Sequence, residues 1–186
     1  MSFISGTQAE LLYNLPAAVT NNTFTTQRVI SAANTLPRAI VPAGFFTYSD
    51  GLLVEARGTV ANAATAATFA NVLAWDPTPG TIGSTIASFP ALAPTASTTC
   101  VWELTAYIMQ YAIGGAGLTL QCNGKWRQSV VATVVFGTAN TEAMFRTQLT
   151  ALNSEAQAAV ELWSTCSASN AGATITVETF NVFGLN

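Results

Sequence analysis

Histidine is absent from all 186 residues of the chain. This absence excludes a Ser-His-Asp triad and a Cys-His pair, and it removes a common zinc ligand. Without histidine, no side chain of ordinary pKa changes its charge between about pH 5 and 8. We therefore expect stability and assembly to be nearly constant across that range.

Charged side chains are scarce as well, at 8% of the residues, against about 25% in an average soluble domain. Because a soluble monomer normally has a well-charged surface, this composition favours a surface partly covered by other protein, and we expect a homo-oligomer. The alternative is the neutral, Thr-rich surface of a secreted β-protein.

Basic clusters, long apolar runs and targeting segments are also missing. Six Lys and Arg against nine Asp and Glu give a formal net charge of −3. Contacts of Lys and Arg with phosphates dominate nucleic-acid affinity, and this sequence has no run of basic residues that could make them. No stretch reaches the ~20 apolar residues of a membrane span. Residues 1–7 lack the pattern of a signal peptide. We expect no nucleic-acid or membrane partner, and synthesis in a cytoplasm.

The three cysteines, Cys100, Cys122 and Cys166, are odd in number and far apart. Their spacing does not match a zinc site, and the strand-like context of Cys100 and Cys122 predicts free, buried thiols that pack as small hydrophobes. We expect neither a metal nor a cofactor.

No proline follows Pro94, so every backbone N–H in the second half of the chain can donate a hydrogen bond to a neighbouring strand, as long β-strands require. Residues 1–40 hold scattered hydrophobes with no sustained period, yet they are too apolar for a disordered tail. We predict an arm over 1–40, docked on a neighbour or on a larger shell, followed by a β-domain over 41–186. The alternative is an arm that covers the bottom of its own domain. The candidate docking residues are Leu11, Leu12, Tyr13, Leu15 and Phe24.

Alternation of apolar and polar residues is the main pattern that is present. Residues 98–126 contain two long alternating runs joined by Gly114-Gly115-Ala116-Gly117, which predicts an antiparallel hairpin with one packed face. Trp102 and Leu104 face inward in the first run, and Leu118 and Leu120 in the second. Further strands are expected at 52–60, 69–75, 130–136, 160–165 and 174–183.

Two segments leave alternatives open. Residues 138–158 fit either a helix or a strand from Phe145 to Leu152. In the last strand, Ile175 and Val177 fall on one face and Phe180 and Val182 on the other, so either a bulge shifts the phase or both faces are covered. With so many strands, the fold class is all-β, an antiparallel β-sandwich of jelly-roll type.

The residues that could perform chemistry are few. Glu103 and Glu161 are the candidates for neighbours across a sheet, and two carboxylates ~5 to 9 Å apart can hydrolyse glycosidic bonds. Each lies on the polar side of an alternating strand, however, which predicts a solvated side chain. Asp50 and Asp76 are single acids in turns. We therefore predict that the chain is not an enzyme.

Exposed aromatic residues are the remaining candidates for binding. Tyr107 and Tyr111 are expected on the polar face of their strand, with Trp126 nearby. Such rings can stack on sugars, but we expect these two to be buried in an interface between subunits.

Three segments of the sequence resemble one family: "LLVEARGTVANAATAATF", "VWELTAYIMQYAIGGAGLTLQCNGKW" and "AVELWSTCSASNAGATITVETFNVFGLN". Their strands and turns are similar to those of jelly-roll structural proteins from tailed bacteriophages, over about residues 40 to 186. The resemblance implies a non-catalytic capsid decoration protein, trimeric and bound to the major capsid protein on the virion surface. A spike or fibre adhesin that binds a host receptor or glycan is the alternative.

Overall fold

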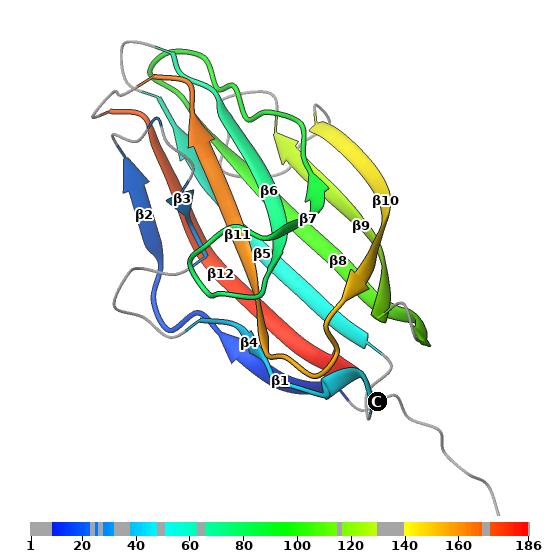
Figure 1. The fold of residues 1–186 in the computed structure, drawn as a ribbon. Helices are drawn as coiled ribbons and strands as arrows, with labels where there is room; N and C mark the ends of the chain where they lie inside the picture. Colours follow the sequence, from blue (N-terminus) through cyan, green and yellow to red (C-terminus); the bar gives the residue numbers. More distant parts are fainter. Residues whose placement is uncertain are drawn as a thin grey trace, which may run out of the picture.

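Two antiparallel β-sheets pack face to face and enclose one hydrophobic core (Figure 1). The computed structural model describes residues 9–22, 25, 28–31, 38–47, 51–62, 66–114, 117–129, 140–168 and 172–185. Within these residues, no helix has the length and apolar character needed to cross a membrane. The predicted all-β antiparallel sandwich is confirmed, whereas jelly-roll connectivity stays a prediction.

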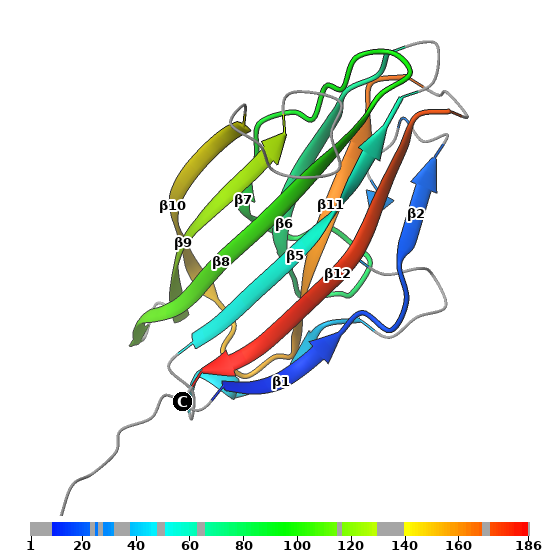
Figure 2. The same ribbon diagram turned by 180° about the vertical axis from the view of Figure 1, so that it is seen from behind.

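The larger sheet, sheet A, has the order β1-β12-β5-β8-β9-β10, and β2 also pairs with β12. Its strands are β1 (Ala9–Asn14), β2 (Val19–Asn22), β5 (Gly51–Ala61), β8 (Thr99–Gly114), β9 (Gly117–Ser129), β10 (Asn140–Leu152) and β12 (Thr174–Leu185). Figure 2 shows β8, β5 and β12 side by side in the middle of this sheet.

The smaller sheet, sheet B, has the order β3-β11-β6-β7, and β4 also pairs with β11. Its strands are β3 (Arg28–Val29), β4 (Ile40–Val41), β6 (Phe69–Asp76), β7 (Ser84–Ser88) and β11 (Ala158–Cys166). A short 3-10 helix, η1 (Phe45–Thr47), precedes β5.

The long hairpin expected from residues 98–126 is formed by β8 and β9, which pair from Trp102↔Gln128 to Gly114↔Gly117. Its predicted inward residues are buried in the core, because alternate side chains of a strand point to the same face. Trp102 stacks on Trp126, with ring centroids 5.2 Å apart, and Trp126 stacks on Phe89 at 4.7 Å.

A β-bulge explains the changed phase of the last strand. The pairing of β12 with β5 shifts between Val177 and Thr179, so Val177 and Phe180 are both buried although three positions separate them. Gly58 lies opposite this bulge, and a Cβ on it would overlap the carbonyl oxygen of Thr176. Only glycine allows the two strands to approach so closely.

Residues 140–152 form strand β10, so the strand alternative for this segment is confirmed. Its pairing with β9 runs from Asn140↔Ser129 to Leu149↔Leu120. The neighbouring β-strand prediction, at residues 130–136, lies outside the described residues.

The described parts of residues 1–40 form β1, β2, β3 and the start of β4 in the same two sheets, together with short connecting segments. Tyr13 and Leu15 are buried in the core of their own chain, so for these two side chains the prediction of docking elsewhere is wrong. A register shift between Leu11 and Tyr13 breaks the alternation of β1, which is why the sequence showed no strand period there. Leu12 is half-buried against the core, and Phe24 lies outside the described residues.

Candidate functional site

The outer face of sheet A, which is turned toward the viewer in Figure 2, is the most distinctive surface of the molecule. All the large hydrophobic side chains that are exposed among the described residues belong to strands of sheet A and point away from the core. They are Leu11 on β1, Tyr107, Met109 and Tyr111 on β8, and Met144 on β10.

One end of this face carries a row of alternating charges across neighbouring strands. Arg57, Glu103, Arg127 and Glu142 are consecutive partners in register on β5, β8, β9 and β10. Arg127 lies 3.8 Å from Glu103 and 3.3 Å from Glu142. The exposed Glu178 extends the row beyond Arg57, at 4.0 Å. Opposite charges in such cross-strand pairs fix the register, although exposed ion pairs contribute little stability.

The other end of the face is apolar on β1, β12, β5 and β8, and polar on β9 and β10, where Asn123 and Arg146 follow Tyr107 in the row. A second row of side chains lies four positions along the strands from the charged row. In this second row, Phe183, Leu53 and Tyr107 are consecutive partners on β12, β5 and β8, and Leu11 pairs with Phe183 at the edge of the sheet. Phe183 and Leu53 are half-buried, whereas Leu11 is 53% exposed and Tyr107 45% exposed. Along β12, β5 and β8 the face therefore changes from polar and charged to apolar.

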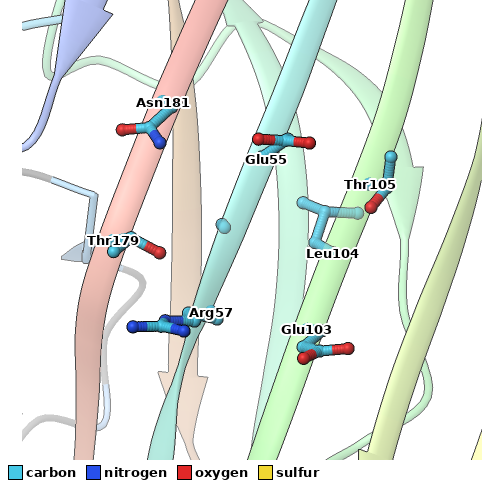
Figure 3. Close-up of a pocket in the computed structure, with 8 residues that line it drawn as sticks. Glu55, Arg57, Glu103, Leu104, Thr105, Thr179 and Asn181 are labelled. Carbon is cyan, nitrogen blue, oxygen red and sulfur yellow. The ribbon is translucent and has the colours of Figure 1, made fainter.

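A shallow groove of about 420 Å³ extends from the charged row toward the apolar row (Figure 3). Its side chains come from β12, β5 and β8, and they supply carboxylate, guanidinium, hydroxyl and amide groups. They are Glu55, Arg57, Glu103, Thr105, Thr179 and Asn181. This set of donors and acceptors suits a ligand with many hydroxyl groups.

The structure corrects two of the predicted binding features. Trp126 is fully buried between Trp102 and Phe89, so it does not join the exposed Tyr107 and Tyr111 in a sugar-stacking surface. Trp126 occupies an inward position of β9, where the large ring fills the space between the sheets.

Glu103 and Glu161 are not neighbours. Glu103 lies on the outer face of sheet A, and Glu161 lies on the outer face of sheet B, so they form no catalytic pair. Glu161 is also only 1% exposed, and the prediction that it is solvated is wrong. Residues 77–83, which connect β6 and β7, fold back over this part of sheet B.

A second buried acid lies beside Glu161. Asp76 is fully buried at the end of β6, where Oδ2 accepts a hydrogen bond from Nε1 of Trp163 (2.7 Å) and Oδ1 accepts one from the N–H of Gly83 (2.6 Å). Burial, followed by a hydrogen bond with the Glu161 carboxyl group, raises the pKa of Asp76 to about 7. In the sequence, Asp76 has the appearance of an ordinary turn residue, because nothing local shows that the turn folds over it.

The cysteines occupy the environment expected from their strand positions. Cys100, Cys122 and Cys166 are buried and are not joined in disulfide bonds, and burial raises the pKa of Cys122 to about 12. Among the described residues, no three His, Cys, Asp or Glu side chains gather closely enough to hold a metal ion.

Comparison with known proteins adds no identification. No protein-family model and no curated protein matches the sequence. One solved structure, of a protein of unknown function from Shewanella oneidensis MR-1, aligns over 100% of this chain and 83% of its own length. The identity is 13% and the TM-score 0.36, so no conclusion about fold or function follows.

Proposed function

We propose that the chain is a non-catalytic structural subunit that associates with copies of itself through the outer face of sheet A. The observation that carries the proposal is an apolar area on this one face, in which the half-buried Phe183 and Leu53 join the exposed Leu11, Tyr107, Met109 and Tyr111. Scattered single hydrophobes are normal on a protein surface, but a contiguous apolar area marks an interaction site.

The arrangement of the face supports a contact with another copy of the chain. Tyrosine and methionine are enriched in the cores of protein interfaces, and a polar rim usually surrounds such a core. Here the apolar row of Phe183, Leu53 and Tyr107 is continuous with the charged row that contains Arg57 and Glu103. A row of alternating charges also tolerates a second copy of itself that is shifted by one strand, because like charges then do not face each other, while the apolar area provides the contact.

At the finer level, we propose a virion protein of the capsid-decoration type, bound as an oligomer to the outside of a phage head. The low content of charged residues, 8%, supports a subunit whose surface is largely covered. The resemblance of the strand and turn pattern to phage jelly-roll structural proteins supports the location. Measuring the copy number of the chain in purified particles tests the assignment to capsid decoration, because decoration requires hundreds of copies.

A charge placed on the apolar row tests the self-association. We expect the wild-type chain to be oligomeric at micromolar concentration by light scattering, and Tyr107→Glu to be monomeric with an unchanged circular dichroism spectrum. Thr85→Glu is the matched control, because Thr85 is exposed on β7 of the other sheet. A monomeric wild-type chain would contradict the proposal, as would a Tyr107→Glu variant that stays assembled.

The groove favours a second candidate function, a spike or fibre adhesin that binds a glycan. Its hydroxyl, amide and charged groups lie two residues along β5 and β8 from Leu53 and the exposed ring of Tyr107. Polar groups beside an aromatic ring are a common arrangement for sugar recognition. Titration with a panel of oligosaccharides should then give binding that Arg57→Ala abolishes. Arg146→Ala, on the same face outside the groove, should bind normally.

A further inference from the structure

Residues 77–83 form a flap over the outer face of sheet B, and two carboxyl groups hold it there. In Figure 1 this segment follows β6 and crosses in front of β11. The N–H of Gly80 donates to Oε2 of Glu161 (2.8 Å), and the N–H of Gly83 donates to Oδ1 of Asp76 (2.6 Å). Gly80 has a φ of +80°, a conformation that favours glycine. The flap is therefore anchored to the sheet at both of its glycines.

The two acids lie close together, and the positive charge that offsets their negative charge comes from Arg38. Asp76 and Glu161 are diagonal neighbours on the paired strands β6 and β11, and their carboxyl groups are hydrogen-bonded to each other. The guanidinium group of Arg38 lies 2.6 Å from Oε1 of Glu161. The phenol of Tyr13 also interacts electrostatically with Glu161 and Arg38. The flap and β7 contain no titratable residue.

A pair of this kind does not carry two negative charges without cost. Arg38 offsets the charge of Glu161, and a proton on Asp76 allows its carboxyl group to donate a hydrogen bond to Glu161. If both groups ionise, two adjacent buried anions repel each other, and one of them lacks a cation. The hydrogen bonds from Gly83 and Trp163 favour the ionised form of Asp76, but the cost of burial is larger, so ionisation favours a state in which water reaches the carboxyl group.

The flap covers an apolar cluster that is separate from the main core. Ala74 and Trp163 are buried there, and the half-buried side chains of Val72 and Ile82 pack against them. Ile82 belongs to the flap, whereas the other three belong to β6 and β11. Opening the flap would therefore expose the indole ring of Trp163.

We propose that residues 77–83 are a proton-controlled flap, closed while the Asp76–Glu161 pair holds a proton and opened when both carboxyl groups ionise. Opening removes the contacts of Gly80 and Gly83 with the acids and uncovers Trp163. The raised pKa of Asp76, about 7, places the transition near neutral pH. The proposal is independent of the self-association described above, because the flap lies on the other sheet.

Hydrogen exchange of the full chain, followed by NMR from pH 5 to pH 9, tests the flap. We expect the protection factors of the Gly80 and Gly83 amides and of the Trp163 indole N–H to fall at least tenfold between pH 6 and pH 8. Protection factors already remove the intrinsic dependence of exchange on pH. Amides in the middle of β5 serve as the internal reference and should keep their protection.

The variant Asp76→Asn separates ionisation from other effects of pH. The amide group does not ionise, so the protection of Gly80 and Gly83 should become independent of pH, whatever its absolute level. Glu103→Gln is the matched control, since it removes an exposed carboxyl group from the other sheet, and it should keep the wild-type transition.

Two results would overturn the proposal: protection factors of the wild-type chain that stay constant across the range, or a transition that survives in Asp76→Asn. If Asp76→Asn does not fold, Glu161→Gln takes its place, with the same expectation. Carboxyl carbon chemical shifts of the wild-type chain then decide whether Asp76 titrates together with the opening.

Discussion

A single buried residue predicts a dependence on pH that the composition does not suggest. The flat stability profile expected from the absence of histidine assumed solvated acids, whereas burial raises the pKa of the Asp76 carboxyl group to about 7. In the unfolded chain an aspartate has a pKa of about 3.9. Between these two values, the folded chain binds a proton that the unfolded chain has lost.

This difference sets the sign of the first prediction. Because the folded state binds more protons, its stability falls as the pH rises from about 4 to about 7, by up to about 4 kcal/mol, and changes little above that. Urea unfolding at pH 5 and at pH 8 should show the higher midpoint at pH 5. In Asp76→Asn the two midpoints should coincide. A wild-type midpoint that rises toward pH 8 would contradict the assignment.

Gly58 provides a second prediction at the scale of one residue. A methyl group at this position overlaps the backbone of Thr176 and approaches the ring of Trp102. We expect Gly58→Ala to lower the free energy of unfolding by about 3 kcal/mol, because strands β5 and β12 must separate to accept it. Thr59→Ala, at the next position on the outer face, should cost far less in the same denaturation assay.

At the scale of elements, the edge strand β1 contributes to both the core and the candidate interface. Tyr13 is buried and packs edge-on against Phe180, with ring centroids 6.1 Å apart, while Leu11 is 53% exposed beside Phe183. The register shift between these two residues directs their side chains to opposite faces of the sheet. One short strand therefore closes the sandwich and extends its apolar outer face.

These two roles are separable by substitution. Tyr13→Ala should destabilise the chain by about 3 kcal/mol, because it leaves a cavity in the core. Leu11→Ala should change the unfolding free energy of the monomer by less than about 0.5 kcal/mol but raise the dissociation constant of the oligomer. Thermal unfolding and sedimentation measurements distinguish the two effects. Equal destabilisation by both substitutions would show that Leu11 also belongs to the core.

At the scale of the whole molecule, charge and apolar area are distributed unequally over the surface. The exposed large hydrophobes of the described residues lie on the outer face of sheet A. The charged row on the same face already satisfies its ion pairs within one chain, as in the contacts of Arg127 with Glu103 and Glu142. Association should therefore depend mainly on the burial of apolar area.

This distribution predicts an assembly that is insensitive to salt. Between ~0.05 and 0.5 M salt, the dissociation constant of the oligomer should change less than about threefold, because screening acts on charges and not on apolar contacts. Analytical ultracentrifugation across that range provides the measurement. Dissociation at high salt would instead indicate that the charged row forms the contact.

The sequence by itself determined the β-sandwich class and the faces of its central strands. In β5, β8, β9 and β12, successive side chains alternate between core and solvent, and this local period of two is visible without knowledge of the partner strands. Even the bulge near Val177 could be anticipated, since an extra residue changes the phase of the pattern.

Only the tertiary structure decided the roles of residues whose partners are distant in the chain. Arg38 and Glu161 form their contact across 123 positions, and Asp76 meets Trp163 across 87. Tyr13 likewise enters the core because β12 lies beside β1. The burial of such side chains depends on which segments fold over them. A local period records the direction of a side chain but not what covers it, so the buried acids and the apolar outer face followed from the packing alone.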